Sequence, residues 1–337
     1  MYIKNLYNTP YHKKDISKDK FLITGGAGFI GSNLVEYLLK FGAGHVRVLD
    51  NLSNGYYENI KYFVELPNFE FIEGDIRDLE TCKKAVLGMD YISHQAALGS
   101  VPRSIADPIT SNEVNVSGFL NILIAANESI SLKKLVYAAS SSTYGDSTKL
   151  PKIEGNEGRP LSPYAVTKLV NELYADVFSR VYNFHSIGLR YFNIFGPRQN
   201  PNNPYAAVIP IFCKAFIDGN SPVINGDGQT SRDFTFVENA IQANVKALMS
   251  DGLVKHEIFN VACGDQISLN EMIGLLNNIS SNNLDVQYGP ERLGDVRHSR
   301  ASIDKIVNIL EYEPEFGFKE GLEIVFNWYK LNNSNGK

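Results

Sequence analysis

Tyr164 and Lys168 lie four residues apart in the stretch SPYAVTK (162–168), a spacing that suits proton transfer. Ser162 is a favourable helix N-cap and Pro163 suits the first helical position, so a helix is predicted to begin there. In such a helix the two side chains face the same way. A free phenol has a pKa of about 10. The neighbouring ammonium would lower that pKa, so that Tyr164 could take the proton of an alcohol.

A second reactive set follows the predicted strand KLVYAAS (134–140), where Ser140, Ser141, Ser142 and Thr143 are consecutive. Ligands bind at the carboxyl edge of doubly wound sheets, so one or two of these hydroxyls are expected to hold the substrate oxygen beside Tyr164. Strand alternation would direct Ser140 and Ser142 to one face and Ser141 to the other, which leaves the choice open. Ser141 and Ser142 are the candidate catalytic hydroxyls.

A glycine-rich turn near the N-terminus predicts a dinucleotide site. In FLITGGAGFIGSNLVEYLL, Gly25, Gly28 and Gly31 lie between a buried-type strand and an amphipathic helix. Gly25 would permit the tight turn, Gly28 would let the backbone approach a pyrophosphate, and Gly31 would allow close packing of helix on strand. A turn with glycines and no ligand is the alternative. The strand, spacing and helix together favour the dinucleotide.

The next predicted strand, HVRVLD, ends in Asp50, 19 residues after Gly31. A carboxylate there accepts hydrogen bonds from the adenosine ribose and repels a 2′-phosphate, so NAD is favoured over NADP. Asp75 and Ile76 follow a third strand, where adenine would lie. With NAD⁺ bound, its positive nicotinamide ring would add to the effect of Lys168 on the pKa of Tyr164. An ordinary exposed helix is the alternative for Tyr164 and Lys168, and the glycine turn makes it the weaker one.

The elements that would position these residues alternate along the first 195 residues. Strands are predicted at 21–24, 45–50, 69–75, 89–97, 134–140 and 185–193, with helical patterns at 29–42, 110–129 and 162–183 between them. This order predicts an α/β fold with a Rossmann-type doubly wound parallel sheet. Residues 1–195 are predicted as the NAD-binding domain, with 1–19 as a polar lead segment. Residues 196–337 are predicted mainly as a smaller α/β substrate-binding lobe, with chain crossings between lobes left open.

Composition excludes several classes of partner. A net charge of −5 in 337 residues predicts neither nucleic-acid nor membrane binding, and no apolar run is long enough to cross a bilayer. Three widely spaced cysteines and a charged N-terminus without an apolar core predict a cytoplasmic chain without a signal peptide. Six histidines lack the spacing of metal ligands, so no metal site is predicted. His94 is expected to stabilise the strand that carries it.

Together the motifs resemble a known family. TGGAGFIG, the serine-rich strand end, the YxxxK motif YAVTK and LRYFNIFGPRQ resemble the extended short-chain dehydrogenase/reductases, and within them the NAD-dependent nucleotide-sugar 4-epimerases. HQAALGSVPRSIADP, NGDGQTSRDF and GDVRHS are most similar to bacterial enzymes that interconvert UDP-GlcNAc and UDP-GalNAc for surface-polysaccharide synthesis. The likeness covers nearly the whole chain.

The resemblance implies a reaction and a set of contacts. Tyr164 would deprotonate the C4 hydroxyl of the sugar, hydride would pass to tightly bound NAD, and the 4-keto sugar would turn over before hydride returns to its other face. The implied NAD contacts are Gly25, Gly28, Phe29, Ile30, Gly31, Asp50, Asn51, Asn54, Gly55, Asp75, Ile76, Gln95, Ala96, Ala97, Asn115, Tyr164, Lys168 and Tyr191. The implied UDP-sugar contacts are Ser100, Ser141, Ser142, Asn193, Ala207, Val208, Asn225, Arg232, Arg292, Asp295 and Ser299.

Two features of the sequence favour one reaction and one kind of substrate among those of this family. The stretch SSSTYG lacks the carboxylates that related dehydratases and decarboxylases carry there, which favours epimerisation. Ser299 stands where epimerases restricted to unacetylated hexoses place a tyrosine, so it would leave room for an N-acetyl group. Ser100 and Ala207 are small for the same reason.

Two other functions remain open at this level. A 4-epimerase for the uronic acids UDP-GlcNAcA and UDP-GalNAcA would share these motifs, and a catalytically silent NAD-binding protein would share the fold. Tyr164, Lys168 and the serines argue against the silent protein, because a sensor needs none of them. Helical stretches 108–128 and 162–183 carry apolar residues on more than one face. The resemblance implies that they form a homodimer interface.

Overall fold

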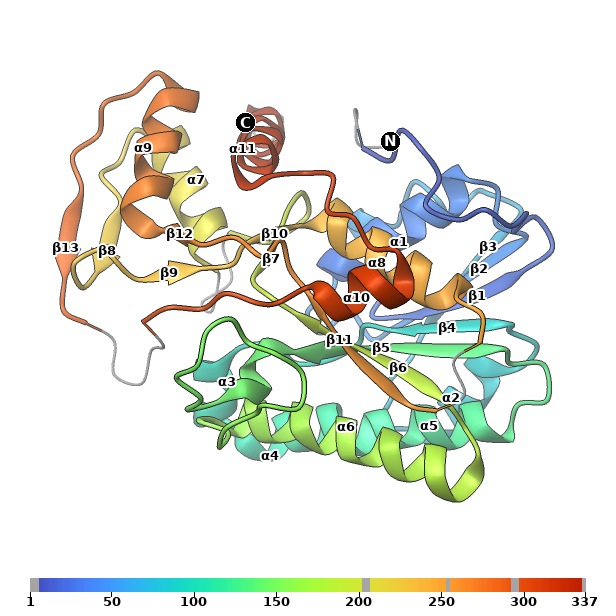
Figure 1. The fold of residues 1–337 in the computed structure, drawn as a ribbon. Helices are drawn as coiled ribbons and strands as arrows, with labels where there is room; N and C mark the ends of the chain where they lie inside the picture. The colour runs from blue at the N-terminus through green and yellow to red at the C-terminus, as the bar shows by residue number, and fades with distance from the viewer. Residues whose placement is uncertain (1–5, 202–206, 253–254, 292–296, 335–337) are drawn as a thin grey trace.

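A parallel sheet of seven strands forms the centre of the molecule, with helices on both faces (Figure 1). The computed structural model describes residues 6–201, 207–252, 255–291 and 297–334. The strand order is β11-β6-β5-β4-β1-β2-β3, and every neighbouring pair is parallel. This is the doubly wound order, and the predicted fold class is confirmed.

The elements agree closely with the predicted ones. The sheet strands are β1 (Lys20–Thr24), β2 (His45–Asp50), β3 (Phe69–Glu73), β4 (Tyr91–His94), β5 (Lys134–Ser140), β6 (Ser186–Tyr191) and β11 (Glu257–Val261). Shorter strands pair as β7 (Ile194–Phe195) with β10 (Thr235–Phe236), β8 (Val223–Asn225) with β13 (Gln287–Gly289), and β9 (Ser231–Arg232) with β12 (Ile267–Ser268). The α-helices are α1 (Phe29–Lys40), α2 (Leu79–Val86), α3 (Val101–Ala106), α4 (Pro108–Asn112), α5 (Phe119–Glu128), α6 (Pro163–Tyr182), α7 (Val208–Asp218), α8 (Val237–Met249), α9 (Leu269–Ser280), α10 (Asp304–Leu310) and α11 (Phe318–Ser334). Two 3₁₀ turns, η1 (Tyr57–Asn59) and η3 (Ser141–Tyr144), and a π-helical turn, η2 (Glu113–Gly118), complete them.

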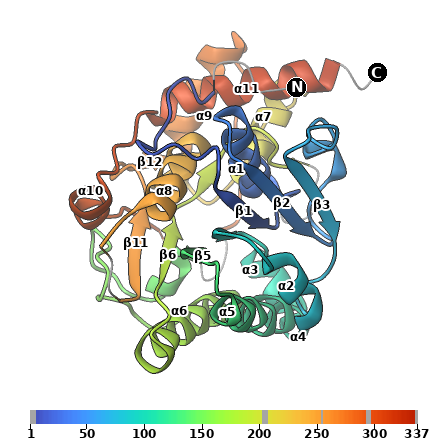
Figure 2. The same cartoon turned by 90° about the vertical axis from the view of Figure 1, so that its right-hand side faces the viewer.

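Helices cover the two faces of the sheet as two layers. In Figure 2, α2, α5 and α6 lie below the strands, and α1 and α8 lie on the other side. Each layer has its own apolar core against the sheet. Because both faces are covered, the inner strands are apolar along most of their length, as in FLIT of β1 and KLVYAAS of β5.

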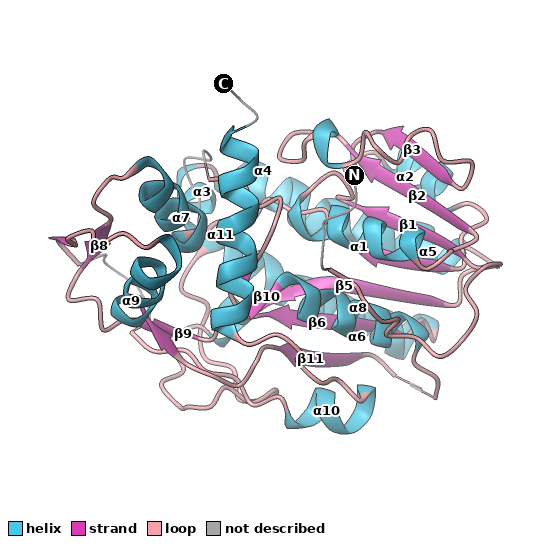
Figure 3. Cartoon of the chain, turned by 90° about the horizontal axis from the view of Figure 1, so that it is seen from above, coloured by secondary structure: helices cyan, strands magenta, loops and turns pink. Residues whose placement is uncertain are grey.

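The chain leaves the sheet after β6 and later returns to it. In Figure 3, α7, α9, β8 and β9 are grouped at one end of the sheet, whereas α8 packs over it. β11 then pairs with β6 as the outer strand. The division into two domains at residue 195 stays a prediction. β11 follows residue 195 in the sequence and completes the central sheet. No helix among the described residues combines the length and apolar character needed to cross a bilayer.

The polar lead segment is held against the layer formed by α1 and α8. Leu6, Tyr7 and Ile16 are buried. The Tyr7 amide donates to Glu238 Oε1 of α8 (2.7 Å), and Lys40 Nζ of α1 donates to the Leu6 carbonyl (2.8 Å). The segment therefore joins α1 to α8 instead of lying free in solvent.

Candidate active site

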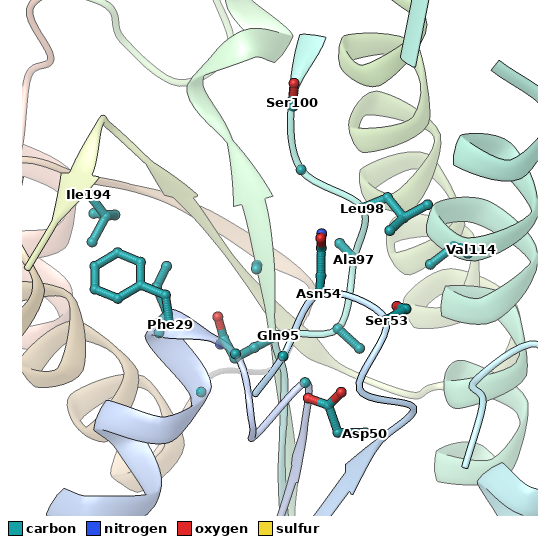
Figure 4. Close-up of a pocket in the computed structure, with 18 of the residues that line it drawn as sticks. Phe29, Asp50, Ser53, Asn54, Gln95, Ala97, Leu98, Ser100, Val114 and Ile194 are labelled. Carbon is teal, nitrogen blue, oxygen red and sulfur yellow. The ribbon is translucent and has the colours of Figure 1, made fainter. Parts of the chain in front are cut away.

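A cavity of about 530 Å³ opens at the carboxyl edge of the sheet, between the loops that follow β1, β2, β4, β5 and β6 (Figure 4). It is lined by most of the predicted cofactor residues: Gly25, Gly28, Phe29, Ile30, Gly31, Asp50, Asn51, Asn54, Gly55, Asp75, Ile76, Gln95, Ala96, Ala97, Tyr164, Lys168 and Tyr191. Of the predicted sugar-nucleotide residues, Ser100, Asn193 and Ala207 line the same cavity. The sheet topology therefore brings residues that are spread from Gly25 to Ala207 in the sequence to a single cavity.

The glycine turn has the geometry that its sequence predicts. Gly25 has φ +68°, a conformation that L side chains rarely adopt, and a Cβ there would come within 2.6 Å of the Ala96 nitrogen. A Cβ on Gly31 would lie 2.2 Å from the Gly25 carbonyl oxygen. Gly28 precedes the first residue of α1, and no side chain caps that helix. The first amides of α1 are thus available to an anion such as a diphosphate.

Asp50 is held rigidly at the end of β2. Its Oδ2 accepts a hydrogen bond from the Ala27 amide (3.0 Å), and its Oδ1 accepts one from the Leu52 amide (2.8 Å). Burial raises the pKa of this carboxyl, against the effect of the two amides. Each oxygen keeps a further lone pair for a ribose hydroxyl. Together with the glycine turn, this arrangement fits a dinucleotide with a free ribose 2′-hydroxyl.

The Tyr164–Lys168 pair lies on α6 as predicted. The helix begins at Pro163, and the Ser162 hydroxyl caps it by accepting from the Ala165 amide (3.1 Å). Lys168 Nζ donates to the Ala138 carbonyl of β5 (2.8 Å) and lies 6.0 Å from the centre of the Tyr164 ring. Both side chains line the cavity, so they share one face of the helix.

Burial shifts the pKa values of both groups in this pair. Burial raises the pKa of Tyr164 above its usual value, and only a hydrogen bond from the Ser140 hydroxyl acts to lower it. Burial also lowers the pKa of Lys168 to about 8, partly offset by the negative charge of Glu172. The predicted lowering of the phenol pKa involves both Lys168 and the positive ring of bound NAD⁺, and it stays a prediction. Burial of the phenol acts in the opposite direction and has to be offset by those charges.

The serine-rich segment also differs from its prediction. β5 ends at Ser140 and the chain turns into η3 at Ser141, so strand alternation does not apply. Ser140 lines the cavity with Tyr164, and its hydroxyl acts to lower the pKa of the phenol, whereas Ser141 and Ser142 do not line the cavity. The Ser142 amide (3.1 Å) and hydroxyl (2.9 Å) both donate to Ser140 Oγ. Ser140 Oγ is the acceptor in both bonds, so its own proton is not used in them. Because Ser140 also lines the cavity, it is the best placed of the three serines to donate to the phenol.

A buried polar network behind the cavity was not apparent from the sequence. Asn244 of α8 donates to Tyr191 Oη (2.7 Å) and accepts from Gln95 Nε2 (3.0 Å), while Tyr191 Oη donates to Gln95 Oε1 (3.1 Å). Asn244 is fully buried and belongs to the returning part of the chain. It fixes two cavity side chains, Gln95 directly after β4 and Tyr191 at the end of β6. An asparagine within an apolar helical pattern is the one signal that could have revealed it.

His94 supports β4 from below the site. Its Nδ1 lies 2.7 Å from Thr24 Oγ1 of β1, which agrees with a role in stabilising the strand. Burial and the nearby charge of Lys168 lower its pKa to about 3. The ring is therefore neutral and adds no second positive charge beside Lys168.

Several predicted residues do not line the cavity. Asn115 is buried behind it, where its side chain bonds to the backbone of Leu98 and to Thr167 Oγ1. Val208 begins α7 and packs on the apolar core. Away from the cavity, in the lobe, lie Asn225 on β8, Arg232 on β9 and Ser299, whose amide donates to the Ser231 carbonyl. Arg292 and Asp295 lie outside the described residues.

Comparison with known proteins identifies the family. Residues 21–262 match the NAD dependent epimerase/dehydratase family. The chain belongs to this family. Its cofactor is NAD, in agreement with Asp50 and the glycine turn.

Relatives of this NAD-dependent epimerase/dehydratase cover nearly its whole length. UDP-glucose 4-epimerase of Mycolicibacterium smegmatis is 34% identical over 311 residues, which are 92% of this chain and 98% of that protein. UDP-N-acetylglucosamine 4-epimerase from Methanobrevibacter ruminantium M1, solved with UDP-N-acetylmuramic acid, has a TM-score of 0.88 at 37% identity and covers 93% of this chain and 99% of that one. UDP-glucuronic acid 4-epimerase from Bacillus cereus, solved with UDP-glucuronic acid and NAD, has a TM-score of 0.85 at 30% identity, with 93% and 99% covered.

Proposed function

We propose that this chain is a UDP-sugar 4-epimerase and that it interconverts UDP-GlcNAc and UDP-GalNAc. The observation that carries the proposal is the group formed by Tyr164, Ser140 and Lys168 at the cofactor cavity, with no carboxylate in the adjoining SSSTYG segment. The three similar enzymes named above, each a UDP-sugar 4-epimerase by its name, support the reaction type.

The residues divide the chemistry between them. Bound NAD would accept hydride from C4 of the sugar and return it to the opposite face of C4. Tyr164 takes the C4 hydroxyl proton and later gives it back, and Ser140 donates a hydrogen bond to the phenolate. Lys168 adds a positive charge on the same face. Because burial raises the pKa of Tyr164, the positive charge of NAD⁺ has to offset desolvation before the phenol acts as a base.

The choice of an acetylated sugar as the substrate is based on small side chains at three positions. Ser100 and Ala207 line the cavity, and Ser299 is placed in the lobe that would cover the sugar. The similarity to the UDP-N-acetylglucosamine 4-epimerase supports this choice. The proposed contacts to the UDP part are Asn193, Val208, Asn225, Arg232, Arg292 and Asp295, with Ser141 and Ser142 beside the sugar.

A uronic acid substrate is the second candidate, favoured by the similarity to the B. cereus UDP-glucuronic acid 4-epimerase. One experiment separates the candidates: purified protein is incubated with UDP-GlcNAc, UDP-glucose, UDP-glucuronic acid and UDP-GlcNAcA in turn, and the epimers are resolved by NMR. Fastest turnover of UDP-GlcNAc supports the proposal. Faster turnover of UDP-glucuronic acid or UDP-GlcNAcA would identify a uronic acid as the substrate. No turnover of any of the four sugars would indicate a catalytically silent NAD-binding protein.

Enlarging Ser299 should reduce activity selectively. Replacing Ser299 with Tyr is expected to lower kcat/KM for UDP-GlcNAc by roughly 10- to 100-fold and for UDP-glucose by less than about threefold, because the ring would fill the space for the N-acetyl group. Initial rates with both sugars measure the effect. Ser299→Ala, which keeps the position small, is the control. Equal losses on the two sugars would remove the size argument.

We also propose a homodimer formed through α6 and its neighbours. Val166, Leu173, Val177 and Val181 are exposed along one face of α6, and Ile109 of α4 is exposed beside it. Figure 2 shows α4, α5 and α6 together at one edge of the molecule. An apolar stripe on an outer helix layer is typical of a buried contact between subunits.

A charge in the middle of this stripe should separate the subunits. Leu173→Glu is expected to halve the mass measured by light scattering at micromolar concentration, because the carboxylate would be buried without a partner. Val307→Glu, on an exposed position of α10 away from the stripe, is the matched control and should leave the mass unchanged. A wild-type protein that is already monomeric would contradict the proposal.

A further inference from the structure

Tyr7 of the polar lead segment is bonded to the helix that begins at the glycine turn. Its side chain is fully buried, and its hydroxyl donates to Asn33 Oδ1 of α1 (2.9 Å). Its ring meets the Tyr37 ring of α1 edge to face, with 5.6 Å between the ring centres. The family match begins at residue 21, so Tyr7 precedes the matched part of the chain. A residue outside the sheet thus supplies a fixed hydrogen-bond donor to α1.

Asn33 uses both ends of its side-chain amide. It is fully buried, and its Nδ2 donates to the Phe29 carbonyl (2.9 Å) and to the Pro197 carbonyl (3.2 Å). The nitrogen of an amide carries two donors, and the oxygen only accepts. The hydrogen bond from Tyr7 to Oδ1 therefore determines which end of the amide faces the two carbonyls. Pro197 belongs to residues 196–200, which follow β7 and which we call the cavity loop.

The cavity loop forms part of the wall of the cavity, where Arg198, Gln199 and Asn200 line it. The loop is held to α1 at a second point, because Arg198 pairs with buried Glu36 and its Nη1 donates to the Ser32 carbonyl (3.0 Å). The backbone of Arg198 has φ +70°, an uncommon conformation for a residue other than glycine. The contacts with α1 therefore hold the loop in a shape that its own backbone does not favour.

Loss of the Tyr7 hydroxyl would weaken one of these contacts. Asn33 Oδ1 would become a buried acceptor without a donor, which is unfavourable. Rotation of the amide would place its oxygen against two carbonyl oxygens and deprive Pro197 of its donor. Neither orientation satisfies all of these groups, so the cavity loop would depend more on Arg198 alone.

We propose that Tyr7 is a positioning residue for the substrate, acting through Asn33 and the cavity loop. The loop lies in the sequence between Asn193 and Ala207, two proposed contacts of the UDP-sugar that line the cavity. The inference rests on the proposed function in that the ligand beside the loop is a UDP-sugar. Tyr7 itself does not line the cavity, so it acts only through other residues. The polar lead segment is then part of the apparatus that binds the substrate.

The test compares UDP binding by NAD-loaded proteins in isothermal titration calorimetry, because UDP is common to all the candidate substrates. Tyr7→Phe removes the hydroxyl and keeps the ring. It is expected to raise the Kd for UDP by about 5- to 20-fold, since one buried hydrogen bond is lost. With UDP-GlcNAc, KM should rise by a similar factor and kcat should stay within about twofold, because the reacting groups lie on α6 and β5.

Tyr11→Phe is the matched control. Tyr11 lies in the same segment, and its hydroxyl donates to Glu238 Oε1 of α8 (2.8 Å) instead of to Asn33. This variant should bind UDP like the wild type, even where its melting temperature falls. An equal rise in Kd for both variants would show a general effect of the lead segment and would overturn the role given to the bond between Tyr7 and Asn33.

Hydrogen exchange followed by mass spectrometry tests the link to the cavity loop directly. Peptides from the loop should exchange faster in Tyr7→Phe than in the wild type, and at the wild-type rate in Tyr11→Phe. Should Tyr7→Phe fail to fold, Asn33→Leu removes the donor to Pro197 and should weaken UDP binding in the same way. A Kd for UDP within twofold of the wild type overturns the proposal. If the wild type does not bind UDP, the proposed function fails, and the exchange rates still decide whether Tyr7 positions the loop.

Discussion

Replacing Tyr164 with Phe is expected to lower kcat for C4 epimerisation by about 10²- to 10⁴-fold, with NAD still bound. The substitution keeps the ring that lines the cavity and removes only the phenol hydroxyl, which is the group that would take the proton. Without it, hydride would have to leave C4 while the hydroxyl proton stays, which raises the barrier. The measurement is the rate at which the second epimer appears in NMR spectra, at equal NAD content for both proteins.

The control for Tyr164 is a tyrosine on the same helix outside the cavity. Tyr182 is exposed at the last residue of α6, so Tyr182→Phe should retain full activity. If the Tyr164→Phe protein folds, binds NAD and turns over within tenfold of the wild type, Tyr164 is not the base. Ser140 would then have to be considered as the residue that moves the proton.

Lys168→Met is expected to make the protein less active and more stable. Lys168 is buried, and its pKa falls from 10.5 to about 8, so the charged form costs the folded state about 3 kcal/mol at neutral pH. A methionine of similar length removes that cost and loses one hydrogen bond to the Ala138 carbonyl. We expect a gain in unfolding free energy of about 1–3 kcal/mol and a loss in kcat of about 10²-fold or more. Thermal melts of nucleotide-free protein and NMR rates measure the two effects.

The pH dependence of this gain has a definite sign. In the folded protein Lys168 loses its proton above a pH of about 8, whereas the unfolded chain keeps it to about 10.5. The penalty is therefore complete below pH 8, shrinks as the pH rises, and is absent above about 10.5. The stability advantage of Lys168→Met should shrink over the same window. An advantage that does not change with pH would contradict a buried ammonium.

Lys134 offers a matched control for Lys168. It is a half-buried lysine at the opposite end of β5, its pKa is also lowered by burial, and its Nζ donates to the Ser250 carbonyl (2.8 Å). Lys134→Met should change stability without changing kcat. A loss of activity in Lys134→Met equal to that in Lys168→Met would mean that the effect is general and not specific to the site.

Local sequence signals determined the fold class, the glycine turn and the Tyr164–Lys168 pair. β2 and β5 have the predicted limits, and α6 begins at the predicted Pro163. These features depend on neighbouring residues: the apolar runs of covered strands, the N-cap at Ser162, and the positive φ at Gly25. Interactions of this kind involve residues that are close in the sequence, so a short stretch of sequence is enough to predict them.

Contacts between distant segments decided the rest. Ser140, and not Ser141 or Ser142, lines the cavity with Tyr164 because the chain turns into η3 directly after β5. Asn244 enters the site because α8 returns to the sheet, and Tyr7 meets Asn33 because the lead segment packs on α1. Burial sets the pKa of the phenol, and burial depends on everything packed around a group. Such quantities have no local pattern, so only the tertiary structure could determine them.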